Sequence, residues 1–453
     1  MSGAPVRLLV VGAGQRGTWY SRLAVRTGRA EIVAVAEADP ARRAAFAREF
    51  GVPAERTFAS WQQLADLPAA GLASPAATTD LADLAAKTGI ADPAAVAGPS
   101  AGRIADAAIV ATQDAMHEGP AVLLAGLGYH LLLEKPMAPE EGAARRIAEA
   151  VTRAGVIAAV CHVLRYTPYT AVLKELLDSG RIGRLVSMQH LEPVGWWHQA
   201  HSFVRGNWRN AAVSSPMLLS KACHDVDWLL YLAGEPVRRV SSFGGLAHFR
   251  ADQRPEGAAD RCLDCAIEHE CPYSALKLYV PLAQAREPHP NAEPVPWPLS
   301  VVSADGSEES VREALRHGEY GRCVYACDND VVDHQVVSME LAGGGTVSLT
   351  MTAFTPLEHR KTRLFGTHGF IDGDGHSLRV VDFRTGADET IDVAAARAGD
   401  HSDGDAGLVA AFVDAVAAGD GSLLHSDVHT SLAGHRVVWA AEKARLSGTV
   451  ETL

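Results

Sequence analysis

The sequence lacks any run of about 18 apolar residues, the length that a helix needs to cross a bilayer. The first predicted strand begins at Val6, which leaves no room for a signal peptide. Basic residues are fewer than acidic ones: the chain has 41 Lys and Arg and 54 Asp and Glu, which gives a formal net charge of −13. This balance disfavours nucleic acids and anionic membranes as partners. We therefore expect a cytoplasmic protein that binds neither.

Cysteine is too scarce for a disulfide framework, and no internal repeat is visible. In a cytosolic chain the seven cysteines should be reduced thiols. The 453 residues are enough for two domains, each with its own core. With 47% apolar and 21% charged residues, the composition is that of an ordinary globular protein.

A short hydrophobic strand, Val6–Val11, leads into a glycine-rich turn, Gly12-Ala13-Gly14-Gln15-Arg16-Gly17, and a helical stretch over residues 18–27. Gly12 permits a tight turn, Gly14 lets backbone N–H groups approach a pyrophosphate, and Gly17 allows the helix to pack closely on the strand. The helix N-terminus then faces the anion. This pattern predicts a phosphate-binding turn formed by Gly12, Gly14, Gln15, Arg16 and Gly17.

An acidic residue follows the second predicted strand, residues 31–36. Glu37 lies 20 residues after Gly17, where a dinucleotide-binding fold places the acid that accepts hydrogen bonds from the adenosine ribose. A carboxylate there repels a 2′-phosphate, so NAD is favoured over NADP.

The first third of the chain alternates short apolar strands with helical patterns. The strands are predicted over residues 6–11, 31–36, 107–111, 130–133 and 156–163. Such alternation favours a parallel, doubly wound α/β sheet of the Rossmann type. We predict an NAD-binding domain over residues 1–155, interrupted over residues 67–102 by a surface insertion rich in Ala, Pro, Thr and Asp.

The pattern then changes to longer alternating strands joined by Gly-rich turns, over residues 185–193, 331–341, 346–352 and 362–365. Helical spacing returns over residues 406–417 and 428–446. We therefore predict a second, α+β domain over residues 156–453 with a large, mainly antiparallel sheet. Such a sheet commonly forms both a substrate wall and a subunit interface.

The charged pair Glu134-Lys135 ends the buried strand at residues 130–133, next to the crevice where doubly wound sheets bind ligands. Pro136 keeps Lys135 extended, so its side chain can point out of the strand end. An ammonium there can hold a substrate hydroxyl and take part in proton transfer. A surface ion pair is the alternative.

A second candidate lies on a helix predicted between Ser215 and Gly234. Lys221 and His224 share one face of that helix, with Asp227 at its edge. Imidazole titrates near neutrality and a neighbouring acid can fix its tautomer, so this set is typical of a proton relay. A structural histidine is the alternative.

Residues 195–209 are rich in aromatic and hydrogen-bonding side chains. Indole faces stack on sugar C–H surfaces while His, Asn and Arg bind hydroxyls, which suits a carbohydrate or cyclitol pocket. A subunit interface would show the same composition. The candidate substrate residues here are Trp197, His198, His201, Arg205, Trp208 and Arg209.

Five cysteines lie between residues 262 and 327. Cys262 and Cys265 have the spacing of a zinc-binding pair, and Cys271 follows. The fourth ligand is open between Cys323, Cys327 and His269. We consider a structural zinc held by Cys262, Cys265, Cys271 and Cys323, and a catalytic zinc much less so, because nicotinamide chemistry does not require one.

The N-terminal fingerprint, Glu134-Lys135-Pro136 and His224-x-x-Asp227 together resemble the Gfo/Idh/MocA family, which includes glucose-fructose oxidoreductase and myo-inositol dehydrogenase. The likeness spans nearly the whole chain except residues 67–102 and the cysteine-rich part. It implies NAD or NADP in the crevice, with Lys135 and His224 flanking the reacting carbon. It also implies a homodimer or homotetramer assembled through the antiparallel sheet.

The resemblance assigns further residues. Thr112 and His117 match the segment near the nicotinamide ribose, and Arg165 and Tyr166 match the start of the second domain and are candidates for substrate contact. Sugar and inositol dehydrogenases of the family usually carry Asp four residues before the catalytic His, whereas this chain has Ser220, followed by Lys221. This departure puts the substrate in doubt more than the fold, and makes Lys221 a candidate second base.

The sequence therefore predicts an NAD-dependent oxidoreductase that acts on a carbinol carbon of a small sugar, sugar derivative or cyclitol. A second hypothesis is a redox-neutral glycoside hydrolase that oxidises the sugar transiently, eliminates the aglycone and returns the hydride. A third is a non-enzymatic regulator that binds NAD and sugar, against which the presence of Lys135 and His224 argues.

Overall fold

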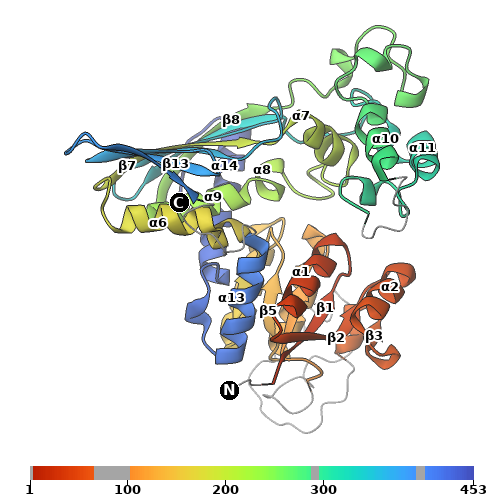
Figure 1. The fold of residues 1–453 in the computed structure, drawn as a ribbon, viewed down its shortest axis with the longest axis horizontal. Coiled ribbons are helices and arrows are strands. Elements are labelled where there is room, and N and C mark those ends of the chain that lie inside the picture. Colours follow the sequence, from red (N-terminus) through yellow and green to blue (C-terminus); the bar gives the residue numbers. More distant parts are fainter. Residues whose placement is uncertain (1–3, 66–102, 287–294, 394–403) are drawn as a thin grey trace.

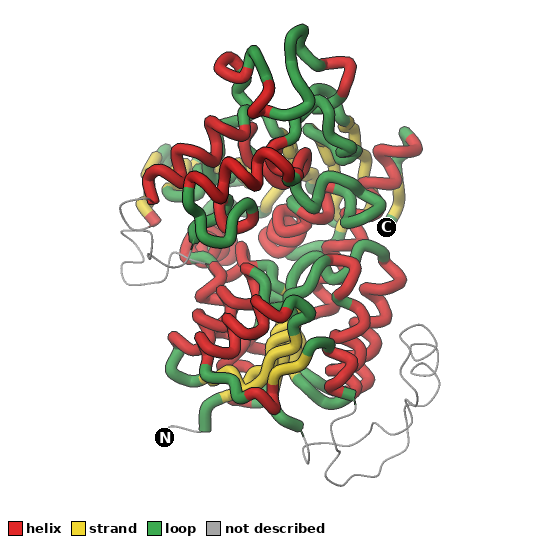
Figure 2. The backbone as a smooth tube through the Cα atoms, turned by 90° about the vertical axis from the view of Figure 1, so that its right-hand side faces the viewer, coloured by secondary structure: helices red, strands yellow, loops and turns green. Residues whose placement is uncertain are grey.

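A computed structural model describes residues 4–65, 103–286, 295–393 and 404–453. It has two layers of different kind, a parallel sheet flanked by helices and, above it, a large sheet with helices on one face (Figure 1). The tube view shows the same two halves in contact along a broad seam (Figure 2). The predicted insertion at residues 67–102 lies outside the described residues.

The first sheet is six-stranded and parallel in the order β3-β2-β1-β4-β5-β6, the order of a Rossmann fold. Its strands are β1 (Val6–Val11), β2 (Ala30–Ala36), β3 (Thr57–Phe58), β4 (Ala107–Val110), β5 (His130–Leu133) and β6 (Ala158–Val160). The helices between them are α1 (Gln15–Arg26), α2 (Pro40–Phe50), α4 (Glu118–Gly126) and α5 (Glu141–Ala154). The predicted doubly wound sheet is confirmed.

The second sheet is nine-stranded, in the order β14-β13-β12-β11-β7-β10-β9-β8-β15, with only β7 and β10 parallel among its neighbouring pairs. The strands are β7 (Leu185–Pro193), β8 (Val237–Gly245), β9 (His334–Leu341), β10 (Thr346–Thr352), β11 (Lys361–Gly366), β12 (Gly369–Gly373), β13 (Ser377–Asp382), β14 (Asp388–Asp392) and β15 (Glu451–Thr452). The predicted mainly antiparallel sheet is therefore confirmed.

Helices cover one face of this sheet and fill the space beyond its edge. They are α6 (Pro168–Asp178), α7 (Trp196–His198), the π-helix η6 (Gln199–Arg205), α8 (Met217–Ser220), α9 (Cys223–Ala233), α10 (Ala275–Arg286) and α11 (Glu308–His317). No helix in the described ranges is both long and apolar enough to span a bilayer.

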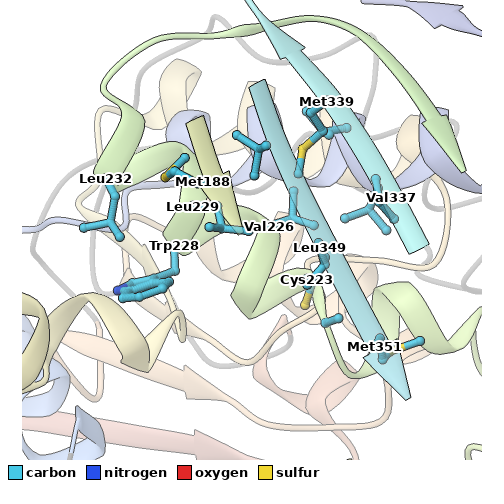
Figure 3. Close-up of a cluster of buried hydrophobic side chains, with 14 of the residues drawn as sticks. Met188, Cys223, Val226, Trp228, Leu229, Leu232, Val337, Met339, Leu349 and Met351 are labelled. Atoms are coloured by element: carbon cyan, nitrogen blue, oxygen red, sulfur yellow. The ribbon is translucent and has the colours of Figure 1, made fainter. Parts of the chain in front are cut away.

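Helix α9 packs its apolar face on the middle of the second sheet. Val226 and Leu229 lie beside Val337 of β9 and Leu349 of β10, all buried in one cluster (Figure 3). This burial fixes the rotation of α9 about its axis. His224 and Asp227, on other faces of the helix, are thereby turned away from the sheet.

Two helices near the C-terminus return to the first domain. Helix α13 (Gly404–Ala418) packs beside α1 on the first sheet, with Phe412 in one buried cluster with Leu8 and Val10 (Figure 1). Helix α14 (Val428–Ser447) contacts both α5 of the first domain and β8 and α9 of the second. Residues 156–453 are therefore not one spatially separate unit, and β6 extends the first sheet beyond residue 155.

Several predicted bounds need correction. The strand predicted over residues 331–341 begins at His334, because the Asp333 carboxylate instead accepts the N–H groups of Ala247, at 2.9 Å, and His248, at 2.7 Å. The strand predicted over residues 156–163 shortens to β6. The helix predicted from residue 215 to residue 234 is broken at residues 221–222 into α8 and α9.

The docking of α13 should depend on the Phe412 ring, which is 1% exposed. Phe412→Ala removes that ring from a closed core and should lower the free energy of unfolding by about 3–5 kcal/mol. Chemical unfolding followed by circular dichroism measures this, with Leu446→Ala, at a side chain 75% exposed, as the control. Equal stability of both variants would contradict the assignment of α13 to the core.

Candidate active site

The glycine-rich turn after β1 has the shape that a pyrophosphate needs. Gly12 has φ +91°, and its N–H donates to the Ala36 carbonyl at 2.9 Å. A Cβ on Gly17 would lie 2.0 Å from the Gly12 carbonyl oxygen, whereas a Cβ on Gly14 would meet nothing within 4 Å. Gly14 also provides no side chain to cap α1. The turn is therefore closed on the protein side and open on the ligand side, with amide groups available to an anion.

Glu37 sits at the same turn. Its carboxylate accepts the N–H of Ala13 at 2.8 Å and that of Asp39 at 2.9 Å. Arg43 donates to the Glu37 carbonyl, so its guanidinium is engaged with the backbone. This geometry fits NAD: Glu37 lies where it can accept ribose hydroxyls, and its charge disfavours a 2′-phosphate.

Glu134 is buried at the end of β5 and holds the rest of the crevice in place. Its Oε1 accepts Arg16 Nε at 2.8 Å and the Tyr20 hydroxyl at 2.9 Å, and its Oε2 accepts the N–H of Lys135 at 2.5 Å. Burial opposes ionisation, but the charges of Arg16 and Lys135 lower the pKa of Glu134 below its ordinary value. The carboxylate is therefore ionised and fixes the start of Lys135.

The predicted cofactor residues Arg16, Thr112 and His117 make internal contacts. The Arg16 guanidinium also bonds Asp405 at 2.6 Å and 3.0 Å. Thr112 Oγ1 donates to the Met116 carbonyl at 3.2 Å. The buried His117 ring lies 2.8 Å from the Pro136 carbonyl and 3.1 Å from that of Thr112. His117 thus braces the strand ends, Gln15 is exposed at the start of α1, and contact of these residues with a cofactor remains a prediction.

Lys135 reaches across the domain boundary to the turn before the helix that carries His224. Lys135 Nζ donates to the Ser220 carbonyl at 2.8 Å, which fastens the end of β5 to the turn between α8 and α9. Burial, together with the nearby charges of Lys135 and His162, holds the pKa of His224 well below its ordinary value. His224 is therefore a neutral imidazole, able to accept a proton, beside an ammonium.

The predicted relay between Asp227 and His224 is not formed. Asp227 accepts Arg165 Nε and Nη2, both at 2.7 Å, in a buried two-point ion pair. His224 Nδ1 is buried without a hydrogen-bond partner in the described part of the chain. The physical reason is that a bidentate guanidinium with the charge of Arg165 outcompetes a neutral imidazole for the carboxylate.

Arg165 and Tyr166 also hold the segment before α14. Arg165 donates to the His425 carbonyl, and the Tyr166 hydroxyl accepts the N–H groups of His425, at 3.0 Å, and Ser426, at 3.1 Å. Both side chains are thus engaged with the chain itself, and their contact with a substrate remains a prediction.

Lys221 lies at the break between α8 and α9, where its Nζ is 3.1 Å from Glu192 Oε1. Glu192 Oε2 is 3.0 Å from Arg360, which also pairs with Asp225, and His190 Nε2 lies 2.9 Å from the same Asp225. Burial opposes ionisation of Asp225, but Arg360 and His190 lower the pKa of its carboxyl far below the ordinary value. A buried network of charged side chains therefore lies beside the helix that carries His224.

Residues 195–209, expected as a ligand-binding segment or a subunit interface, are largely helical: α7 and then the π-helix η6. The Trp197 ring is 5.4 Å from that of Trp297, and the His198 ring is 5.1 Å from the same Trp297. Burial, aided by the charge of Lys221, lowers the pKa of His198 to about 3. His198 is therefore neutral, and contact of Trp197 and His198 with a substrate remains a prediction.

The other members of this segment face into the protein. His201 Nδ1 lies 2.6 Å from the Tyr279 hydroxyl, and burial with the charge of Arg205 lowers the pKa of His201 to about 3. Arg205 is fully buried, the partly buried Trp208 packs against the core cluster, and Arg209 Nε bonds Asp328 at 2.9 Å. His201, Arg205 and Arg209 therefore fasten the segment to residues 262–328, and substrate contact by them remains a prediction.

The structure adds site residues that the sequence analysis missed. The His162 ring lies 5.7 Å from the His224 ring and 5.5 Å from the His435 ring. Neither of its buried ring nitrogens has a hydrogen-bond partner in the described residues, and its Nδ1 lies 3.7 Å from Asp227 Oδ2. His162 follows β6 directly, so the strand-end rule that selected Lys135 also applies to it. Arg360 and Trp297 carry no such signal, because only the tertiary fold brings their loops to the site.

The described residues contain no group of three or more His, Cys, Asp and Glu side chains that could hold a single metal ion. The predicted zinc site at Cys262, Cys265, Cys271 and Cys323 is therefore not supported. These thiols line a cavity instead of converging on one point.

Two family sequence profiles match the chain: the oxidoreductase family with an NAD-binding Rossmann fold over residues 6–162, and the GFO/IDH/MocA C-terminal domain over residues 170–270. Together they cover more than half of its length. The chain belongs to the Gfo/Idh/MocA oxidoreductase family. The predicted family is confirmed, and with it an NAD-binding Rossmann domain.

Individual relatives are distant. The chain is 24% identical to YteT of Bacillus subtilis over 273 residues, 59% of this chain and 60% of that protein. It is 31% identical to inositol 2-dehydrogenase 2 of Saccharopolyspora erythraea over 29% of this chain and 36% of that protein. The chain therefore matches about 60% or less of the length of these relatives.

Among solved structures, levoglucosan dehydrogenase in complex with NADH and levoglucosan superposes with a TM-score of 0.66 at 17% identity, covering 99% of each chain. This likeness shows a shared fold over the whole length. The identity of the substrate does not follow from it.

Loss of one partner of the Arg165–Asp227 ion pair should destabilise the fold much more than replacement of both partners by apolar residues. Asp227→Leu leaves a buried guanidinium without its anion and should cost about 3–5 kcal/mol of unfolding free energy. The double variant Arg165→Met/Asp227→Leu should recover most of that loss. Urea unfolding of the single and double variants measures the coupling, and strictly additive losses would show that the pair does not act as a unit.

Proposed function

We propose that this protein is an NAD-dependent dehydrogenase that removes hydride from a carbinol carbon of a sugar, sugar derivative or cyclitol, or returns it to the ketone. The observation that carries the proposal is the hydrogen bond from Lys135, at the end of the parallel sheet, to the Ser220 carbonyl, in the turn before the helix that carries His224. The charge of Lys135 is felt by His224. Both the fold and the charge states of these groups suit transfer of a hydroxyl proton.

The residues present fit the cofactor. The open side of Gly14 and the uncapped start of α1 suit a pyrophosphate, and the Glu37 carboxylate suits a ribose diol. NAD, when bound, supplies the hydride acceptor at its nicotinamide ring. The protein supplies position and proton handling.

Lys135 can hold the substrate hydroxyl by donating a hydrogen bond from an ammonium that the Ser220 carbonyl orients. The lowered pKa keeps the His224 imidazole neutral through the physiological range, so it can accept a hydrogen bond from the substrate hydroxyl. The same shift weakens the imidazole as a base, so transfer of the proton to it relies on the substrate and cofactor changing its surroundings. As pH falls, this acceptor stays available well below pH 6.5, the ordinary midpoint of an imidazole. The Lys135 charge also stabilises an alkoxide as the proton leaves.

The aromatic group formed by Trp197, His198 and Trp297 supports a sugar or cyclitol over a flat hydrocarbon. Trp197 and Trp297 offer indole faces, and His198 offers a buried Nδ1 that has no partner among the described residues. Faces of this kind stack on C–H surfaces, while unpartnered nitrogens bind hydroxyls. A levoglucosan dehydrogenase and inositol dehydrogenases occur among the relatives, which favours the same substrate class.

Lys221 supports a second candidate function, that of a redox-neutral glycoside hydrolase. Its Nζ lies 3.1 Å from Glu192 Oε1, and its charge is felt by His198. Lys221 would act as a base only after losing its proton to become the neutral amine. A group that removes a proton next to a transient ketone is what the elimination step requires. A homodimer or homotetramer and a cytoplasmic location complete the proposal.

Purified protein with NAD should be incubated with inositols, free sugars and aryl glycosides, while nicotinamide absorbance and product mass are followed together. NADH that accumulates in proportion to ketone is the expected result. Aglycone release without net reduction would replace the dehydrogenase by the hydrolase. No turnover on any class, with NAD still bound, would favour the regulator.

Lys135→Met should reduce kcat by at least about 100-fold, the usual contribution of a positioned acid or base, and leave NAD affinity nearly unchanged. Turnover and calorimetric titration with NAD measure the two effects. Lys443→Met is the matched control, since Lys443 pairs with Glu451 on the surface. Full turnover in Lys135→Met would remove Lys135 from the mechanism.

A further inference from the structure

Two neighbouring histidines at the proposed site have buried ring nitrogens without a hydrogen-bond partner in the described residues. They are His162, which is 0% exposed and lacks a partner on both nitrogens, and His224, which lacks one on Nδ1. A buried polar nitrogen that bonds to nothing costs free energy. Each of these nitrogens should therefore have a partner in the working protein.

The turn that carries His162 is tied to the helix that carries His224. The His162 N–H donates to the Val160 carbonyl at 2.7 Å, and the His162 carbonyl accepts the N–H of Arg165 at 3.2 Å. Arg165 in turn pairs with Asp227 of α9 through two bonds of 2.7 Å. Because His224 lies one helical turn before Asp227, the ion pair brings the two rings together, with 5.7 Å between their centroids.

The third ring of this group, His435, has no nitrogen left to bond His162. Its Nδ1 lies 2.8 Å from the Ser431 carbonyl oxygen, to which it must donate. Its Nε2 accepts the N–H of Met137 at 3.0 Å. The contact of 5.5 Å between the His435 and His162 rings is therefore one of packing alone.

One nitrogen of His162 lies close to an anion. Its Nδ1 is 3.7 Å from Asp227 Oδ2, which is longer than a normal hydrogen bond but near enough to favour a proton on that nitrogen. Burial, together with the charges of Arg165 and Lys135, holds the pKa of His162 well below its ordinary value, so the ring carries a single proton. With that proton on Nδ1, Nε2 keeps a lone pair and can accept a hydrogen bond.

We propose that His162 is a positioning residue whose Nε2 accepts a hydrogen bond from His224 Nδ1, directly or through one water. This role rests on the function proposed above. A centroid separation of 5.7 Å allows either connection between the ring edges. His162 thereby takes the place in which Asp227 was expected.

Such a bond determines which nitrogen of His224 meets the substrate. The proton on Nδ1 stays in place, and the lone pair of Nε2 is left to receive the proton of the substrate hydroxyl. An acceptor for the Nδ1 proton also stabilises the imidazolium that forms, which offsets part of the weakening that burial imposes on His224 as a base.

Two variants separate the hydrogen bond from the packing of the ring. His162→Phe keeps a ring of similar size without nitrogens, and we expect kcat to fall by about 10-fold to 100-fold, the effect of losing one hydrogen bond to a group that becomes charged. KM and NAD affinity should change little. His162→Gln restores an acceptor near the position of Nε2 and should recover much of the loss.

The matched control is His376→Phe, because His376 is exposed and its ring also lies against another histidine, His359, at 4.0 Å. Its kcat should equal that of the wild type, and equal Tm values would show that all variants fold. Wild-type kcat in His162→Phe, with Lys135→Met inactive, would overturn the role of His162 and leave the dehydrogenase standing. A loss in His162→Phe that His162→Gln does not recover would also overturn it.

A crystal structure of the wild-type protein with NAD, at a resolution that shows ordered water, tests the contact without turnover. We expect His162 Nε2 within about 3.2 Å of His224 Nδ1, or one water bonded to both. Any other partner of Nε2, such as Lys135 Nζ or the cofactor, would overturn the role of His162. Because this reading needs no substrate, the dehydrogenase and the role of His162 can fail separately.

Discussion

The buried carboxylate of Glu134 is the point on which the nucleotide crevice depends. It binds Arg16 and Tyr20 of α1 on one side and the N–H of Lys135 on the other, while Arg16 continues to Asp405 at the start of α13. One ionised group thus connects the helix after the glycine turn, the end of β5 and the returning C-terminal helix. An acid can hold this position only because a guanidinium compensates its burial.

Hydrogen bonds from the end of the parallel sheet also join the two domains. Lys135 donates to the Ser220 carbonyl, the Met137 N–H donates to His435 Nε2 at 3.0 Å, and Ser215 Oγ donates to Asp114 at 3.0 Å. Each bond runs from the end of the parallel sheet to α8, to the segment just before α8, or to α14. Because α9 is fixed by its apolar face on the large sheet, these bonds place His224 opposite Lys135 with little freedom. The proposed chemistry needs such fixed geometry more than it needs unusual groups.

The described residues between 246 and 328 lie beyond the edge of the second sheet and pack against η6 (Figure 1). They carry Tyr279 and Tyr320, which pack on His201, and the thiol-lined cavity next to Arg205. Helix η6 therefore packs against a segment that contains α10, α11 and several single-turn helices.

The sequence by itself determined the parallel sheet, the glycine turn with Glu37, the Lys135 strand end and the family, because each rests on local spacing that a short segment enforces. It did not determine the partners of Asp227, the break that moves Lys221 off the His224 helix, or the approach of Arg360, Trp297 and Cys323. Those contacts join segments tens to hundreds of residues apart. A buried charged group must be paired, and the packing of the folded chain determines which oppositely charged group lies next to it. Arg165 rather than His224 is that partner for Asp227.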